Sequence, residues 1–102
     1  MIHVIAIITA KPGMRDAILK EFHANMPPVH AEKGCIEYGP AVDAEGIGSF
    51  QAKFGPDTFV VIEKWESREA LKEHAASPHM AAYAAKTRDM TAGRTIHVLQ
   101  PG

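Results

Sequence analysis

The stretch from Thr58 to Tyr83 constrains the fold more than any other part of this 102-residue chain. It opens with TFVVIEKW, a run of mostly β-branched and aromatic residues that is typical of a strand buried on both faces. A helix is predicted directly afterwards, because Ser67 is a good N-cap and residues 70, 71, 74 and 75 share one helical face. Ser77-Pro78 is a second helix start, since proline is well tolerated at the first helical position. The stretch therefore predicts a buried strand followed by a helix split in two.

The remaining segments predict three more strands and one more helix. Pro27 ends the first helix, because an internal proline removes a backbone donor and clashes with the preceding turn. Gly39-Pro40 indicates a bulge or an edge position in the second strand, and Gly93 ends the last helix. The predicted elements are a strand at 2–10, a helix at 14–26, a strand at 35–42, a loop at 43–56 with a short extended piece near 49–54, and a strand at 94–99.

The predicted order β-α-β-β-α-β is that of a ferredoxin-like α+β domain, an antiparallel sheet with its helices on one face. We expect one such domain over residues 1–102, because no linker or internal repeat is visible. Both faces of the first strand are apolar, with Ile5 and Ile7 on one face and Val4 and Ile8 on the other. Helices cover only one face, so we expect the other to pack against the sheet of a second copy in a homodimer.

Charge and composition exclude several classes of function. The formal net charge is −1 and no basic patch is visible, which argues against a nucleic-acid partner or an anionic membrane surface. The apolar run at residues 2–10 is too short to span a bilayer. The single cysteine, Cys35, has no disulfide partner, which fits a reducing cytoplasm. We therefore expect a cytoplasmic protein with a small-molecule partner.

Several motifs together resemble the antibiotic biosynthesis monooxygenase domain family, and the resemblance covers nearly the whole chain. They are KPG at 11–13, GCIEY at 34–38, EKWES at 63–67, AL at 70–71, His74, and SPHM at 77–80. The resemblance implies a dimeric α+β barrel with a pocket between helices and sheet. It also implies a small aromatic substrate of the quinol or polyphenol type, dioxygen as the second substrate, and no cofactor. Haem-degrading relatives differ, because the first strand here has no asparagine, and His74 and Ala84 replace their tryptophan and haem-binding histidine.

His74 is the predicted catalytic base, because it follows the buried face of Ala70 and Leu71 by one turn. A neutral imidazole, with an ordinary pKa of about 6.5, can take a phenolic proton at neutral pH. The alternative is a half-buried histidine bonded to a backbone carbonyl. The other predicted pocket residues are Trp65, His79, Tyr83, Phe22 and Met80, although Trp65 also suits a core position.

No metal site is predicted, because His74 and His79 are five residues apart and no carboxylate or thiol completes a ligand set. No phosphate-binding loop or dinucleotide fingerprint appears, so we expect no cofactor. Two alternatives to a monooxygenase stay open at this point. One is a non-catalytic dimeric small-molecule-binding or stress-response domain, and the other is an isomerase or lyase that uses the same pocket and base.

Overall fold

The computed structural model describes residues 1–102 and contains the predicted βαββαβ order, with the second helix split in two. Each strand is joined to its neighbours by backbone hydrogen bonds, and each helix packs on the sheet. The elements are β1 (Ile2–Ala10), α1 (Arg15–His30), β2 (Cys35–Ala41), β3 (Thr58–Trp65), α2 (Arg68–Ala75), α3 (Pro78–Thr87), a 3₁₀ turn (Arg88–Met90) and β4 (Thr91–Leu99).

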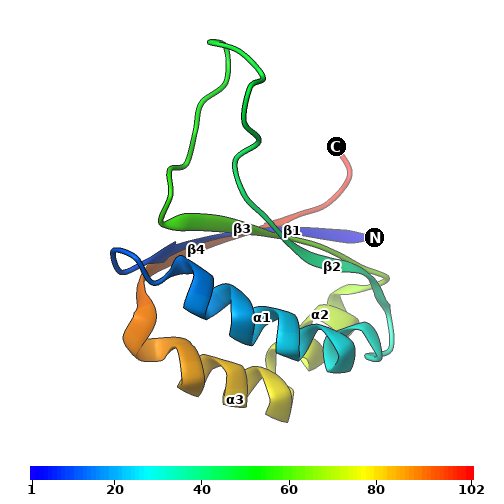
Figure 1. Cartoon of the computed structure of the whole chain (residues 1–102). Coiled ribbons are helices and arrows are strands. Elements are labelled where there is room, and N and C mark those ends of the chain that lie inside the picture. Colours follow the sequence, from blue (N-terminus) through cyan, green and yellow to red (C-terminus); the bar gives the residue numbers. More distant parts are fainter.

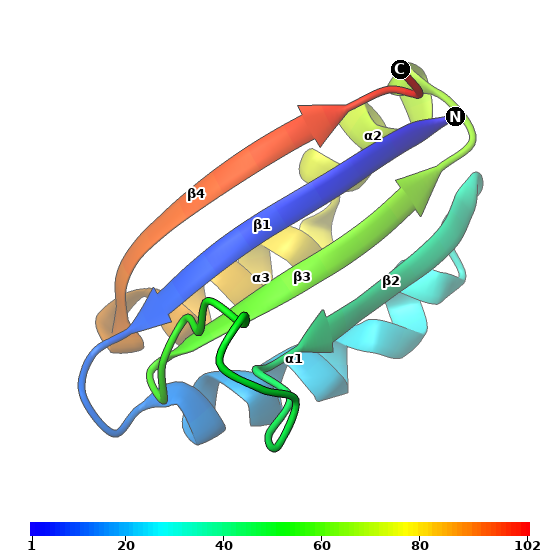
Figure 2. The same ribbon diagram turned by 90° about the horizontal axis from the view of Figure 1, so that it is seen from above.

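The four strands form one antiparallel sheet in the order β2-β3-β1-β4. All three helices lie on one face of this sheet, and the other face is left without helices (Figures 1 and 2). In the central pair Ile5 lies opposite Ile62, and Val4 lies opposite Glu63. This is the predicted ferredoxin-like α+β fold, with β2 at one edge of the sheet and β4 at the other.

The core lies between the sheet and the helices. Phe22 of α1 is 1% exposed, and its ring contacts those of Tyr38, Phe59 and Tyr83 at centroid distances of 5.1, 5.9 and 5.9 Å. Alternation along the central strands supplies the rest of this layer, because every second side chain points to the helices. The buried apolar residues are Ile2, Val4, Ala6, Ala10, Ile18, Phe22, Val29, Tyr38, Phe59, Val61, Trp65 and Ala70.

Two predicted boundaries were wrong. Helix α1 continues through Pro27 and Pro28 to His30 instead of ending at residue 26. The last turn is held by Val29, which is fully buried, and by the Ala31 N–H, which donates to the Pro27 carbonyl at 3.1 Å. Packing therefore outweighs the lost backbone hydrogen bonds of the two prolines.

Strand β4 begins at residue 91, three residues earlier than predicted, so Ala92 and Gly93 belong to the strand and do not end a helix. The cause is pairing with β1, because Thr91 lies opposite Ala10 and Gly93 opposite Thr9. Neighbouring backbone groups thus decide the conformation of a segment whose own sequence favours a helix end.

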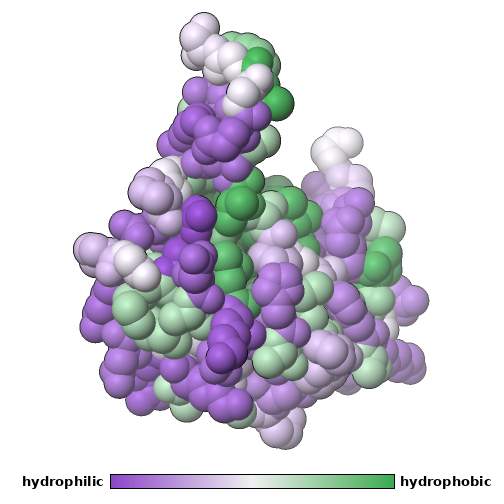
Figure 3. Space-filling view, in the orientation of Figure 1, coloured by the Kyte–Doolittle hydropathy of each residue, from purple (hydrophilic) through white to green (hydrophobic).

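Residues 42–57 form an arm that stands out from the helix-free face of the sheet (Figure 1). The extended piece expected near residues 49–54 does not pair as a strand. Asp43 closes the base of the arm, because its carboxylate accepts the N–H groups of Phe54 at 3.0 Å and Gly55 at 2.8 Å. Phe50, in contrast, is 84% exposed. Apolar surface gathers near the tip of the arm and at its base (Figure 3).

No helix in the structure is both long enough and apolar enough to cross a bilayer.

Candidate functional site

A cavity of about 770 Å³ lies between helices α2 and α3 on one side and strands β1 and β4 on the other. This volume is in the range of sites that bind small organic molecules. Most of its wall is apolar, and the lining groups best suited to exchange a proton are His74, Glu63 and Tyr83. The rest of the lining consists of Val4, Ile8, Leu71, Ala75, Met80, Ala81, Ala84, Thr87, Arg88, Thr91, Ala92, Gly93, Arg94, Ile96 and Val98.

His74 reaches this cavity from the last turn of α2. Ser67 starts the helix as its N-cap, since its hydroxyl accepts the Ala70 N–H at 3.1 Å. The imidazole is 4% exposed and lies between two aromatic rings, with the Trp65 centroid at 4.5 Å and the Tyr38 centroid at 5.3 Å. Packing against these two rings therefore restricts the orientation of the His74 imidazole, in addition to its hydrogen bonds.

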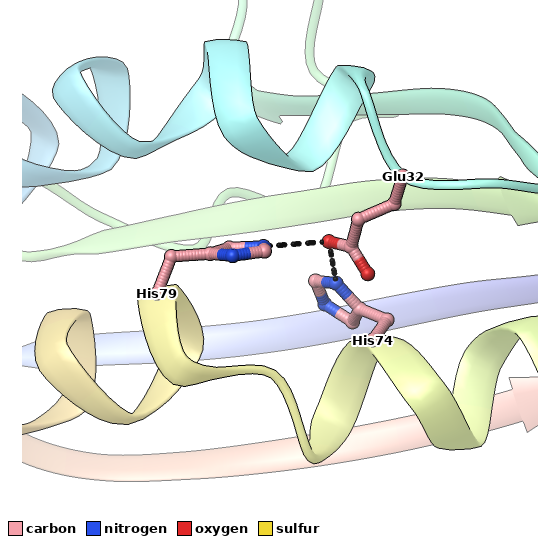
Figure 4. A group of neighbouring side chains, drawn as sticks. All are labelled: Glu32, His74 and His79. Carbon is pink, nitrogen blue, oxygen red and sulfur yellow. Dashed lines mark hydrogen bonds and ion pairs between the residues drawn. The ribbon is translucent and has the colours of Figure 1, made fainter.

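The carboxylate of Glu32 holds two imidazoles at once. Glu32 follows the end of α1, and its Oε2 lies 2.8 Å from His74 Nδ1 and 2.9 Å from His79 Nε2 (Figure 4). His79 comes from the first turn of α3, and its Nε2 also lies 3.2 Å from the Ser77 hydroxyl. A carboxylate oxygen only accepts hydrogen bonds, so both of these ring nitrogens carry a proton. A neutral His74 consequently has its free lone pair on Nε2.

Glu63 is the second carboxylate beside His74. It lies on the helix-facing side of β3, where its Oε1 accepts the Trp65 indole N–H at 2.9 Å and lies 3.9 Å from His74 Nε2. Burial raises the pKa of Glu63, and this outweighs the opposing effects of the Trp65 hydrogen bond and of His74. No lysine or arginine forms an ion pair with it. The cavity therefore has a base with a free lone pair and a carboxyl group that retains its proton more readily than usual.

Tyr83 and Met80 form part of the wall on the α3 side. Burial raises the pKa of Tyr83 to about 12, so its hydroxyl is a neutral donor near pH 7. The Met80 sulfur accepts the Asn25 amide at 3.4 Å and faces the Tyr38 hydroxyl at 3.9 Å. Burial likewise raises the pKa of Tyr38. The contacts with Asn25 and Tyr38 fix the Met80 thioether in the cavity wall.

The structure places the predicted pocket residues in three groups. His74, Met80 and Tyr83 line the cavity. Trp65 and Phe22 lie in the core, with 0% and 1% exposure, and do not reach its wall. His79 lies beside Glu32, away from the lining.

Two residues of the site, Glu32 and Glu63, were missed by sequence reasoning. Glu63 left a signal, because a carboxylate in an otherwise apolar strand and two positions before Trp65 shares the face of that tryptophan. Glu32 left none, since it lies in a short segment between Pro28 and Gly34 whose direction no periodicity indicates.

Glu32, His74 and His79 are also the one group whose metal-ligating atoms converge, all within 4.8 Å of one another. The expectation that no carboxylate joins the two histidines was therefore wrong. However, both nitrogen–oxygen distances, 2.8 and 2.9 Å, are shorter than the ~3.4 Å between ligands of a tetrahedral site with ~2.1 Å bonds. The geometry is that of a hydrogen-bonded cluster in which His74 Nδ1 and His79 Nε2 each donate a proton to the Glu32 carboxylate.

Comparison with known proteins places this fold and site in a family. The family model described as Antibiotic biosynthesis monooxygenase matches residues 1–86. The chain is 41% identical over 104 residues to the Escherichia coli (strain K12) protein named Probable quinol monooxygenase YgiN, covering 100% of this chain and 99% of that protein. It is 32% identical over 99 residues to the Rv0793 protein of Mycobacterium tuberculosis, covering 96% of this chain and 88% of that protein.

Solved structures agree over the whole fold, including β4, which lies beyond the matched residues. The structure of Rv0793 from Mycobacterium tuberculosis superposes with a TM-score of 0.79 at 31% identity, covering 98% of this chain and 93% of that one. PA3566 from Pseudomonas aeruginosa superposes with a TM-score of 0.81 at 27% identity, covering 98% and 92%. The chain belongs to the antibiotic biosynthesis monooxygenase family.

Proposed function

We propose that this protein is a monooxygenase that oxidises a small quinol or polyphenol with dioxygen, without a resident cofactor, in the cavity beside His74. Family membership supports an oxygenase, and the name of the Escherichia coli relative supports a quinol as substrate. A quinol that has lost a proton is rich enough in electrons to reduce dioxygen directly. The protein then has to supply a base, a dry enclosure and a fixed position for the ring.

The observation that carries this proposal is the state of His74. Its Nδ1–H is fixed on the Glu32 carboxylate at 2.8 Å, so the free lone pair of the neutral ring lies on Nε2, beside the cavity. When Nε2 takes the quinol proton, the imidazolium that forms is stabilised by the same carboxylate. Glu32 thus acts as a positioning residue for the base.

The cavity wall suits an aromatic substrate. Eleven of its 18 lining residues are hydrophobic, which suits contact with the apolar face of an aromatic ring. The Tyr83 hydroxyl, neutral at physiological pH, can donate a hydrogen bond to a second oxygen of the ring. A quinol has two such oxygens, one for His74 and one for Tyr83.

The test is oxygen consumption with a panel of reduced quinols, with the product identified by mass spectrometry. The wild-type protein is expected to incorporate one oxygen atom from labelled dioxygen. His74→Gln is expected to lose ~10²–10⁴-fold in kcat, the usual contribution of a general base. His23→Gln, an exposed histidine on α1, is the matched control. Turnover in His74→Gln equal to that of the control would remove His74 as the base.

The facing groups His74 and Glu63 also suit a second activity, proton transfer within a substrate by an isomerase, because a base and an acid lie 3.9 Å apart. The two activities separate cleanly in one assay. An isomerase would exchange substrate hydrogen with deuterated water under anaerobic conditions and consume no oxygen.

We also propose that two copies associate through the helix-free face of the sheet. By register Ile5 and Ile7 of β1 lie beside Ile62 and Val60 of β3 on this face, and Ile62 is 37% exposed. The arm at residues 42–57 rises from the same side (Figure 1). A second copy would cover this apolar strip through a self-complementary two-fold contact.

Light scattering coupled to size-exclusion chromatography tests the association. The wild-type protein is expected to elute with twice the chain mass of 11.1 kDa, and Ile62→Lys with the chain mass. A wild-type monomer at micromolar concentration would reject this arrangement.

We also propose a cytoplasmic location. It is supported by the unpaired Cys35, because a free thiol suits a reducing compartment.

A further inference from the structure

Glu63 is the only carboxylate in the lining of the cavity, and the monooxygenase reaction described above leaves it without a part. Its side chain is 9% exposed, yet it is fixed by a single hydrogen bond from the Trp65 indole at 2.9 Å. One hydrogen bond from a neutral donor does not replace the hydration that an ionised carboxylate loses when it is buried. Its position in the cavity wall, with Oε1 3.9 Å from His74 Nε2, therefore calls for a chemical explanation.

The groups facing Glu63 define its charge state. His74 faces it from α2, with Nε2 at 3.9 Å. Glu32 adds negative charge from the segment after α1, and the Tyr38 hydroxyl and the Cys35 thiol face it from β2. Its own strand contributes only the Trp65 indole. The two carboxylates are thus held differently, since Glu32 accepts bonds from two imidazoles and Glu63 accepts one from a neutral ring.

We propose that Glu63 is a second catalytic residue, the acid that gives a proton to dioxygen-derived oxygen on the substrate ring and takes one back from ring carbon. This inference rests on the proposed monooxygenase function. It assigns separate roles to these two groups of the cavity wall. His74 is the base for the quinol hydroxyl, and Glu63 is the acid for the peroxide.

The steps balance for a hydroquinone with one ring hydrogen next to a hydroxyl. His74 Nε2 takes a hydroxyl proton, the anion passes one electron to dioxygen, and the two radicals combine into a bond between ring carbon and oxygen. Protonated Glu63 gives its proton to the outer peroxide oxygen, which forms a hydroperoxide. The Glu63 carboxylate then takes the hydrogen of the same ring carbon as the O–O bond breaks.

The leaving oxygen receives the proton from the His74 imidazolium and departs as water. The ring keeps one oxygen atom as a carbonyl, which is a tautomer of the hydroxyquinone. Quinol and dioxygen thus yield hydroxyquinone and water, and both His74 and Glu63 return to their starting protonation states. The only oxidant is dioxygen, the second substrate of the proposed reaction.

The test separates acid catalysis from mere support of Trp65. Glu63→Gln keeps an acceptor for the indole and a donor toward the cavity but has no proton to transfer. It is expected to bind the quinone product within about threefold of wild type and to lose ~10²-fold or more in kcat. Trp65→Phe removes the indole hydrogen bond but keeps a carboxyl group that can transfer a proton, so its loss of kcat is expected to be at least tenfold smaller.

The pH profile is the second readout. A proton donor is active below its pKa in the folded protein, so wild-type kcat is expected to fall as the pH rises through the pKa of Glu63. The residual kcat of Glu63→Gln is expected not to show this decrease with rising pH. Glu73→Gln on the exposed side of α2 is the control for the change of charge.

Each outcome of these measurements either supports or overturns the role of Glu63 as the acid. Equal losses in Glu63→Gln and Trp65→Phe, or kcat of Glu63→Gln within threefold of wild type, would reduce Glu63 to a structural contact and overturn the inference. An active wild-type protein with an inactive Glu63→Gln that still binds quinone supports it. If the wild-type protein consumes no oxygen with any quinol, the proposed function itself fails and the acid role fails with it.

Discussion

Strand β3 has two neighbouring residues that reverse the usual distribution of polar and apolar side chains. Glu63 points to the helices and is 7% exposed, whereas Ile62 points to the helix-free face and is 37% exposed. Most proteins do the opposite, because charged groups lose hydration on burial and apolar groups gain from it. The comparison separates the two proposals, since the buried Glu63 belongs to the proposed chemistry on the covered face and the exposed Ile62 to the proposed association on the open one.

The same division extends beyond β3. On the covered face the polar cluster of Glu32, His74 and His79 joins the ends of three helices (Figure 4). On the open face the arm at 42–57 exposes Ile47, Phe50 and Phe54. Local departures from the rules of burial are typical of functional positions.

The largest expected difference in stability is between Phe22, in the core on the helix-covered side of the sheet, and Phe50, on the arm at the open side. Phe22→Ala opens a cavity in the core and is expected to lower the free energy of unfolding by about 3–5 kcal/mol. Phe50→Ala on the arm is expected to change the stability of the isolated chain by less than about 0.5 kcal/mol. Urea unfolding at low protein concentration measures both. A loss for Phe50→Ala as large as for Phe22→Ala would mean that the arm belongs to the core.

Charge removal on the covered face is the next largest expected effect. Glu32→Gln weakens the charge-assisted hydrogen bond to His74, which is worth about 1.5–3 kcal/mol. The expected loss in kcat is therefore about 10–100-fold, with a smaller change in KM. Glu73→Gln, the same change on an exposed position of α2, is expected to leave both constants unchanged. Equal kcat values in the two variants would show that Glu32 does not position the base.

Sequence reasoning succeeded where the pattern is local and failed where distant segments meet. The continuous apolar runs of β1 and β3 and the Ser67 and Ser77-Pro78 starts predicted the strands and the split helix, because each is decided within a few residues. The continuation of α1 through its prolines depends on the burial of Val29, and the early start of β4 depends on pairing with β1. Neither cause is visible in the local sequence.

The site shows the same limit. His74 was predictable because α2 is amphipathic and places it on the buried side. Its partner Glu32 is 42 positions away in the chain and meets it only after the helices pack. Core positions for Trp65 and Phe22 follow from how completely the helices cover them, which composition does not reveal.

Glu63 predicts a pH dependence of stability on the covered face. Its pKa is raised by folding, so the folded state holds the proton more tightly than the unfolded chain does. The stabilisation is complete below the ordinary glutamate pKa, about 4.3, and is lost as the pH rises through the higher pKa of the folded state. Relative to Glu63→Gln, wild-type stability is expected to fall over that window in urea titrations. A difference that does not vary with pH would show that the Glu63 proton is not held by folding.

The smallest expected effect concerns the two serines that start the halves of the split helix. Ser67 accepts the Ala70 N–H, so Ser67→Ala is expected to lower stability by about 1 kcal/mol. Ser77 makes no such cap, and its hydroxyl instead donates to the His74 carbonyl at 2.8 Å. Ser77→Ala is therefore expected to affect turnover more than Ser67→Ala does and to affect stability less. Because the two changes are chemically identical, the reverse order would show that the break between α2 and α3 serves folding and does not orient the cluster on the covered face.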